Sequence, residues 1–172
     1  MRDRAEYVEF VTRHYAALWR TAFLMTGNRH TAEDVVQSAL TRAFVHLSRV
    51  RRADHPDAYV RRMVVNEAIS MRRLRSSGKV ELEDVDRPWW STAVEVGPED
   101  AVAAHQDTAA ALALLSDRQR AVVVLRYYEG FSEAEIAGVL GIRPGSVNGH
   151  ARAGLAALGA RLSVDFLNED RS

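Results

Sequence analysis

Cysteine is absent from this chain of 172 residues, which excludes disulfide bonds, thiolate zinc sites and a cysteine nucleophile. A chain without cysteine suits a reducing compartment, and we expect a cytoplasmic location. No hydrophobic run approaches the length of a membrane span, so membrane insertion is not expected. The first residues, MRDRAEYVEF, lack the apolar core of a secretory signal peptide.

Catalytic motifs are also missing. The six histidines fall on different predicted elements, with no HExxH motif and no paired ligand spacing. The chain has no phosphate-binding P-loop and no dinucleotide fingerprint. The acid pairs Glu33-Asp34 and Glu99-Asp100 stand at predicted helix starts, where capping explains them. We therefore predict a protein that is not an enzyme, binds no metal or cofactor and takes no small-molecule substrate.

Net charge is zero, which by itself argues against a nucleic-acid partner. The distribution of the charge reverses that interpretation. Residues 1–80 carry a net charge of +7, residues 81–117 carry −8 and residues 118–172 carry +1. An asymmetry of this size implies different partners for different segments.

The most informative stretch runs from Ser132 to Leu158. Ser132 and Glu135 have the spacing of a capping box, so a helix is predicted to begin there, and Gly141 can end it in the left-handed conformation. Pro144 suits the first turn of a second helix. That helix carries an apolar stripe of Val147, Ala151, Leu155 and Leu158. Two short helices joined by a tight turn favour a helix-turn-helix, and an ordinary helical hairpin is the alternative.

Helical periodicity also covers the first part of the chain. One helix is predicted over residues 5–25, and a second near Thr31, with Asp34 as its capping-box partner. A loop over residues 48–57 leads to a third helix that Pro56 opens. This loop and the third helix carry Arg51, Arg52, Arg61, Arg62, Arg72, Arg73 and Arg75. Clustered arginines predict a phosphate-binding surface, although those at the helix end could simply complement its dipole.

Periodicity fails between residues 76 and 98, where glycines, prolines and acids are typical of a linker. We therefore predict an all-α fold of two small helical domains, residues 1–75 and 99–172, joined by this acidic linker. In the second domain a helix ending near Leu115 precedes another helix over residues 117–129, which a Ser116–Gln119 capping box begins. The residues predicted to point inward from that helix are Val123, Val124 and Tyr127.

The second helix of the helix-turn-helix would lie in the major groove of DNA. Ser146, Asn148, His150 and Arg152 would then face bases or phosphates. Asn148 has the donor and acceptor needed to pair with adenine, whereas Arg143 and Arg152 are better suited to phosphate. A single small module of this kind binds weakly alone, so tight promoter binding would need help.

Four stretches carry a resemblance to a known family. They are LMTGNRH at residues 24–30, AEDVVQ at 32–37, RRADHPDAYVRR at 51–62 and DRQRAVVVLRYYE at 117–129. Together they resemble the extracytoplasmic-function (ECF, group 4) RNA polymerase sigma factors, in particular the actinobacterial SigE-like subgroup. The resemblance covers nearly all of residues 5–160 in the expected order.

The resemblance implies that the first domain is sigma domain 2 and the second is sigma domain 4. Asp34, Gln37 and Ser38 would then contact the clamp helices of core RNA polymerase. The loop over residues 48–57 and the next helix, with Asn66 and the arginines, would capture flipped bases of the minus-ten element, and the helix-turn-helix would read the minus-thirty-five element. The implied partners are core RNA polymerase, through its clamp helices and flap, promoter DNA, and an anti-sigma factor as a further candidate.

Two departures from the family pattern carry expectations of their own. Ser38 stands where the family usually has glutamate, which would remove one contact to the polymerase. Asn148 and His150 stand where the family commonly has lysine or arginine. Three glycines in the interior of that helix, Gly149, Gly154 and Gly159, should each cost ~1 kcal/mol relative to alanine. We therefore predict weak recognition of the minus-thirty-five element.

Two other functions stay open from the sequence. A helix-turn-helix regulator of the LuxR-like kind would bind duplex DNA without polymerase, but it leaves the basic first domain and Asn66 unexplained. A sigma-like adaptor would bind polymerase or an anti-sigma protein without initiating transcription.

Overall fold

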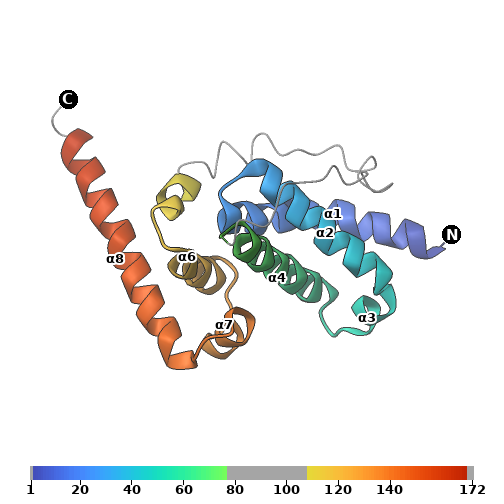
Figure 1. Cartoon of the computed structure of the whole chain (residues 1–172). Helices are drawn as coiled ribbons and strands as arrows, with labels where there is room; N and C mark the ends of the chain where they lie inside the picture. The colour runs from blue at the N-terminus through green and yellow to red at the C-terminus, as the bar shows by residue number, and fades with distance from the viewer. Residues whose placement is uncertain (1, 77–107, 170–172) are drawn as a thin grey trace. The chain divides into compact units, whose positions relative to one another are not determined.

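The computed structural model describes residues 2–76 and 108–169, with side chains over residues 4–71 and 108–160. The chain divides into two compact units, Met1–Val102 and Ala103–Ser172. Helices make up both units, and the described ranges contain no β-strand, which confirms the all-α prediction (Figure 1). The predicted linker lies, apart from its first residue, outside the described residues.

The first unit is built on three long helices and one short one. α1, α2 and α4 pack pairwise against one another, and α3 packs against α2 and α4 (Figure 1). Their apolar faces enclose a core in which Trp19, Val35, Leu40 and Val64 are fully buried. The bounds are α1 Arg2–Thr26, α2 Arg29–Val45, α3 Leu47–Arg52 and α4 Pro56–Ser76.

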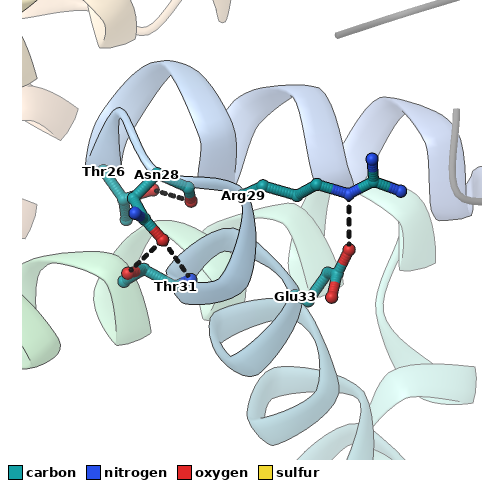
Figure 2. A network of polar contacts seen from close by, with 5 residues as sticks. All are labelled: Thr26, Asn28, Arg29, Thr31 and Glu33. Carbon is teal, nitrogen blue, oxygen red and sulfur yellow. Dashed lines mark hydrogen bonds and ion pairs between the residues drawn. The ribbon is translucent and has the colours of Figure 1, made fainter. Parts of the chain in front are cut away.

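The start of α2 differs from the predicted capping box at Thr31. Asn28 is the N-cap, and its Oδ1 accepts hydrogen bonds from the backbone N–H of Thr31 (3.0 Å) and from Thr31 Oγ1 (3.1 Å) (Figure 2). Gly27, with φ of 70°, ends α1 immediately before this cap. Thr31 is therefore a buried residue of the first turn, and Asp34 lies one turn inside the helix. The predicted box was wrong because Asn28 is an equally good capping residue three positions earlier.

A buried hydrogen bond ties α1 to α2. The Tyr7 hydroxyl donates to the carbonyl oxygen of Leu40 at 2.5 Å, and the Tyr7 ring packs against Phe44. Burial raises the pKa of this hydroxyl above its usual value, because the phenolate would lose its hydration. The neutral phenol therefore serves as a hydrogen-bond donor within the core.

The predicted loop over residues 48–57 is partly helical. α3 occupies its first half, because Val50 is buried and anchors a turn against the bundle. Only residues 53–55 remain between α3 and α4. α4 then begins at Pro56 as predicted, since proline suits the first position of a helix.

The second unit contains helical residues 108–113 followed by four defined elements. Ser116 and Ser132 each form a complete capping box, with Gln119 and Glu135 as partners, which confirms both predicted helix starts. Gly141 ends α7 in the left-handed conformation, also as predicted, and α8 begins at Pro144. The bounds are α6 Asp117–Val123, η1 Val124–Tyr128, α7 Glu133–Leu140 and α8 Pro144–Glu169.

The helix predicted over residues 117–129 changes its winding halfway. η1 is a π-helical turn, in which the backbone N–H of Glu129 donates to the carbonyl of Val124 at 3.0 Å. The wider turn rotates the side chains that follow it. Val123 and Val124 are buried as predicted, but Tyr127 is 56% exposed. The inward placement of Tyr127 was wrong because it assumed regular α-helical winding.

The apolar stripe predicted on α8 is only half correct. Val147 and Ala151 are buried, whereas Leu155 is 45% exposed and Leu158 is half-buried. The next buried residue of α8 after Ala151 is Gly154, which packs against α6. A Cβ atom added to Gly154 would lie 2.8 Å from Val123 Cγ2, so α6 and α8 approach closely at this point. Gly154 is therefore a packing residue, and not only the weak helix former that the sequence indicates.

We predict that Gly154→Ala lowers the free energy of unfolding of the second unit by about 1–3 kcal/mol, because the new methyl group forces α6 and α8 apart. Gly159→Ala is the matched control, since its added Cβ would meet nothing within 4 Å. That variant should gain up to about 1 kcal/mol from helix propensity. Urea denaturation followed by far-ultraviolet circular dichroism measures both. Equal stabilisation by the two substitutions would contradict the close approach.

Candidate nucleic-acid interface

An exposed stripe follows the first three turns of α4. Tyr59, Arg62 and Asn66 are spaced i, i+3 and i+7, which places them on one helix face. All three are exposed, and Tyr59 is 38% exposed despite its aromatic ring. The residues between them that point inward, such as Val60 and Val64, are fully buried. The stripe therefore presents an aromatic ring, a cation and an amide to the solvent from a rigid helix.

Tyr59 was not among the predicted site residues. Its position on the third helix was recognised from the sequence, and the i, i+3, i+7 spacing with Arg62 and Asn66 is the signal that places it on the same face. An exposed aromatic ring beside a cation and an amide suits stacking on an unpaired base.

The arginines near this stripe have acidic or backbone partners. Arg51 Nη2 lies 2.5 Å from Glu6 Oε2 of α1, so part of its charge is offset within the unit. Arg52 Nε donates to the carbonyl of Ser48 at 3.1 Å, which stabilises the exposed end of α3. Arg61, which is half-buried, lies 3.9 Å from Asp57 one turn earlier.

The last predicted cations of the first domain, Arg72, Arg73 and Arg75, belong to the final turns of α4. Their side chains lie outside the described residues.

The predicted polymerase-binding residues lie on α2. Asp34 and Gln37 are both half-buried and one turn apart. Ser38 is engaged within the unit: its hydroxyl donates to Glu67 Oε1 of α4 at 3.0 Å. Glu67 is only 7% exposed, and its other oxygen, Oε2, forms an ion pair with Arg42 at 2.8 Å. A serine at position 38 thus helps to satisfy a buried carboxylate, and this intramolecular bond gives it a structural role that the sequence did not indicate.

In the second unit, the predicted DNA-binding residues surround the start of α8. Arg143 immediately precedes the helix, and Ser146 and Arg152 are exposed on it. His150 is half-buried. The structure thus brings these residues to one helix and its preceding turn, as the sequence predicted.

Asn148 differs from the other predicted base-reading residues. Its Oδ1 accepts a hydrogen bond from Arg126 Nη1 at 2.6 Å, and its Nδ2 donates to Glu133 Oε2 at 2.8 Å. The three side chains come from η1, α7 and α8. Arg126 is a residue that sequence reasoning missed, because the π-helical turn that carries it has no clear sequence signal.

A metal site is not indicated by the described side chains: they contain no group of three or more histidine, aspartate or glutamate residues able to hold an ion. Among the described helices, none is long and apolar enough to cross a membrane.

Comparisons with known proteins identify the family. The model of Sigma-70 region 2 matches residues 10–78, and that of Sigma-70, region 4 matches residues 105–158. The ECF RNA polymerase sigma factor SigL of Mycobacterium tuberculosis (strain ATCC 35801 / TMC 107 / Erdman) is 36% identical over 163 residues, covering 92% of this chain and 88% of SigL. The chain belongs to the ECF RNA polymerase sigma factors. It therefore acts with core RNA polymerase to direct transcription initiation at promoters.

Other relatives and solved structures agree with this assignment. The RNA polymerase sigma-E factor of Streptomyces coelicolor (strain ATCC BAA-471 / A3(2) / M145) is 31% identical over 161 residues, covering 92% of this chain and 86% of that protein. The sigma factor RpoE from Bartonella quintana, solved in complex with the anti-sigma factor NepR, superposes with a TM-score of 0.61 at 25% identity, covering 96% of this chain and 99% of RpoE. CnrH, solved with the cytosolic domain of CnrY, gives 0.59 at 25% identity, covering 94% of this chain and 90% of CnrH. The predicted resemblance to actinobacterial sigma factors is confirmed.

The Ser38–Glu67 bond generates a prediction that separates folding from polymerase binding. Ser38→Ala should lower the free energy of unfolding of the first unit by about 1 kcal/mol, because Glu67 Oε1 loses its hydrogen bond. It should leave the affinity of this sigma factor for core RNA polymerase unchanged. Gln37→Ala, one residue earlier, is the matched control and should lower that affinity with little effect on unfolding. Urea denaturation and fluorescence titration with core polymerase measure the two effects, and a loss of polymerase affinity in Ser38→Ala would show that Ser38 binds the polymerase directly.

Proposed function

We propose that this sigma factor uses α4 to capture unpaired bases of the minus-ten element on the non-template strand. The observation that carries the proposal is the exposed stripe of Tyr59, Arg62 and Asn66 on one rigid helix face. A base extruded from a duplex loses its stacking and its pairing. The Tyr59 ring can restore stacking, the Asn66 amide can bond a base edge, and Arg62 can hold the backbone.

The short helix α3 extends this surface, because it packs beside α4 and carries Arg51 and Arg52 on exposed positions. Arg61 lies within the same basic region, and Arg72, Arg73 and Arg75 would lengthen it along α4. We assign the whole group to the phosphates of the captured strand, where cations contribute affinity without reading sequence.

The other roles follow from the family. In the proposed organisation, residues 1–75 are sigma domain 2, residues 76–98 are the linker and residues 99–172 are sigma domain 4. Asp34 and Gln37 on α2 contact the clamp helices of core polymerase, and domain 4 contacts the flap. The protein acts in the cytoplasm and is not an enzyme. Because the structural relative RpoE was solved in complex with the anti-sigma factor NepR, an anti-sigma factor is a further proposed partner here.

The second unit reads the minus-thirty-five element through α8, with Arg143 and Arg152 on phosphates and Ser146 and His150 close to base edges. Few cations lie on this helix, so its phosphate affinity is low. The weak upstream contact makes initiation depend chiefly on the minus-ten element.

Run-off transcription with purified core polymerase, beside co-elution of the two proteins on gel filtration, tests the proposal. The template carries a promoter that the wild-type holoenzyme selects from a randomised pool. We predict that Asn66→Ala lowers promoter-specific transcripts by about tenfold, the scale of one lost base contact, while co-elution is unchanged. Ser70→Ala is the matched control, since Ser70 is exposed one turn further along α4, and it should transcribe nearly as the wild type. Undiminished transcription by Asn66→Ala would contradict base capture, and co-elution of the wild type without any transcripts would favour a sigma-like adaptor.

The weak upstream contact also generates a prediction. Gly149 is exposed on α8 and an added Cβ there meets nothing within 4 Å, so the position can accept a longer side chain. Gly149→Arg should strengthen upstream protection by the holoenzyme several-fold, because it adds a cation to the DNA-facing helix. Gly149→Ala is the control for helix propensity alone and should leave protection unchanged. Footprinting measures both, and upstream protection by the wild type as strong as that at the minus-ten element would contradict the weak contact.

A further inference from the structure

The orientation of the Asn148 side chain is fixed by the chemistry of its two partners. A guanidinium group can only donate hydrogen bonds, and a carboxylate can only accept them. Oδ1 of Asn148 must therefore face Arg126, and Nδ2 must face Glu133, as observed at 2.6 and 2.8 Å. The amide is held in one of its two flip states by a positive partner on one side and a negative partner on the other.

This engagement competes with base reading. Asparagine recognises adenine with both ends of its amide, accepting from N6 and donating to N7. In this chain both atoms already bond to charged groups, and such bonds are stronger than those between neutral groups. Each atom keeps one further bonding position, a lone pair on Oδ1 and a hydrogen on Nδ2, so an adenine would have to share the amide with both charged partners. The Asn148 amide is therefore already engaged at both ends before any base approaches.

The bond instead fixes Arg126. Arg126 is half-buried, and its guanidinium lies 5.8 Å from the centre of the Tyr127 ring and bonds through Nη1 to Asn148. Asn148 is exposed on the early turns of α8, two residues after Ser146. The cation from η1 is thus held beside the helix that faces DNA. Between Arg143 and Arg152, α8 itself carries no lysine or arginine.

We propose that Asn148 is a positioning residue that holds Arg126 on the DNA-facing surface, with Glu133 orienting the amide, and that it does not read a base. This rests on the proposed function of the second unit in upstream DNA binding. Arg126 then supplies a positive charge that α8 lacks over two turns, and Asn148 acts on DNA only through it.

A charge-conserving exchange distinguishes a residue that positions Arg126 from a residue that reads a base directly. In the double variant Asn148→Asp with Glu133→Gln, the introduced glutamine amide can donate to the introduced aspartate carboxylate, which can still accept from Arg126. The total charge of the three residues is unchanged. An aspartate cannot donate to adenine N7, so a direct base reader would be lost while a positioning residue would be rescued.

The experiment uses the full chain bound to core polymerase and a short labelled duplex that carries the upstream sequence selected by the wild-type holoenzyme, with its single base-pair variants. Asn148→Ala should weaken binding roughly fivefold to tenfold on every duplex alike, the scale of one hydrogen bond at an exposed site. The double variant should return to within about threefold of the wild type with the same base preferences. In an Arg126→Ala background, Asn148→Ala should cost nothing further, whereas Arg152→Ala should still add its own loss.

A second measurement follows Arg126 directly. The ¹⁵N relaxation of its Nε–H group in the protein without DNA should indicate a more mobile side chain in Asn148→Ala and restored order in the double variant. A change in overall folding would not give this recovery.

Several results would overturn the proposal. One is a failed rescue in which the double variant and Asn148→Ala lose discrimination at the same single base pair, as a direct reader requires. Another is an undiminished effect of Asn148→Ala when Arg126 is already absent. A wild-type holoenzyme that selects no upstream sequence would contradict upstream DNA binding itself, and the role of Asn148 with it, even if the relaxation data show that Asn148 orders Arg126.

Discussion

Where each helix begins and ends decides which side chains face the solvent. Gly27, Gly130 and Gly141 adopt positive φ, and each stops or turns the chain at a point where a residue with a Cβ would be strained. Asn28 and Ser132 follow the first two of these turns and cap the next helix. A helix started one residue later would rotate its faces by about 100°. The exposure of functional side chains on α2, α7 and α8 therefore depends on these turns.

Charged side chains have different kinds of partner in the two units. In the first unit, Arg51 and Arg61 near the exposed face of α4 have acidic neighbours. The buried carboxylate of Glu67 accepts a hydrogen bond from the Ser38 hydroxyl and forms an ion pair with Arg42. A buried carboxylate with such partners avoids the cost of an unsatisfied charge. In the second, an arginine and a glutamate are joined through a neutral amide, so a cation lies at the surface of a helix poor in cations. In both units these charged side chains therefore have partners within the unit itself.

The sequence predicts most of the helices because capping residues, glycines and apolar spacing act locally. Pro56, Ser116, Ser132, Gly141 and Pro144 all have the predicted positions. It could not predict α3, because a buried valine in an arginine-rich segment forms a helical turn only when the bundle is present to receive it. The π-helical turn was missed for a similar reason, and with it the exposure of Tyr127 and the approach of Arg126 to Asn148. Residue types identified the candidate site, but long-range contacts decide which of those residues are available to DNA.

One face of α4 is proposed to hold an unpaired strand. The most direct measurement replaces Tyr59 with the photoreactive residue p-benzoylphenylalanine and maps the crosslinks formed in a complex of core polymerase, this sigma factor and a selected promoter. We predict crosslinks to bases of the non-template strand within the minus-ten element, formed only when core polymerase is present. Crosslinks confined to a polymerase subunit, or formed equally with closed duplex DNA, would contradict it.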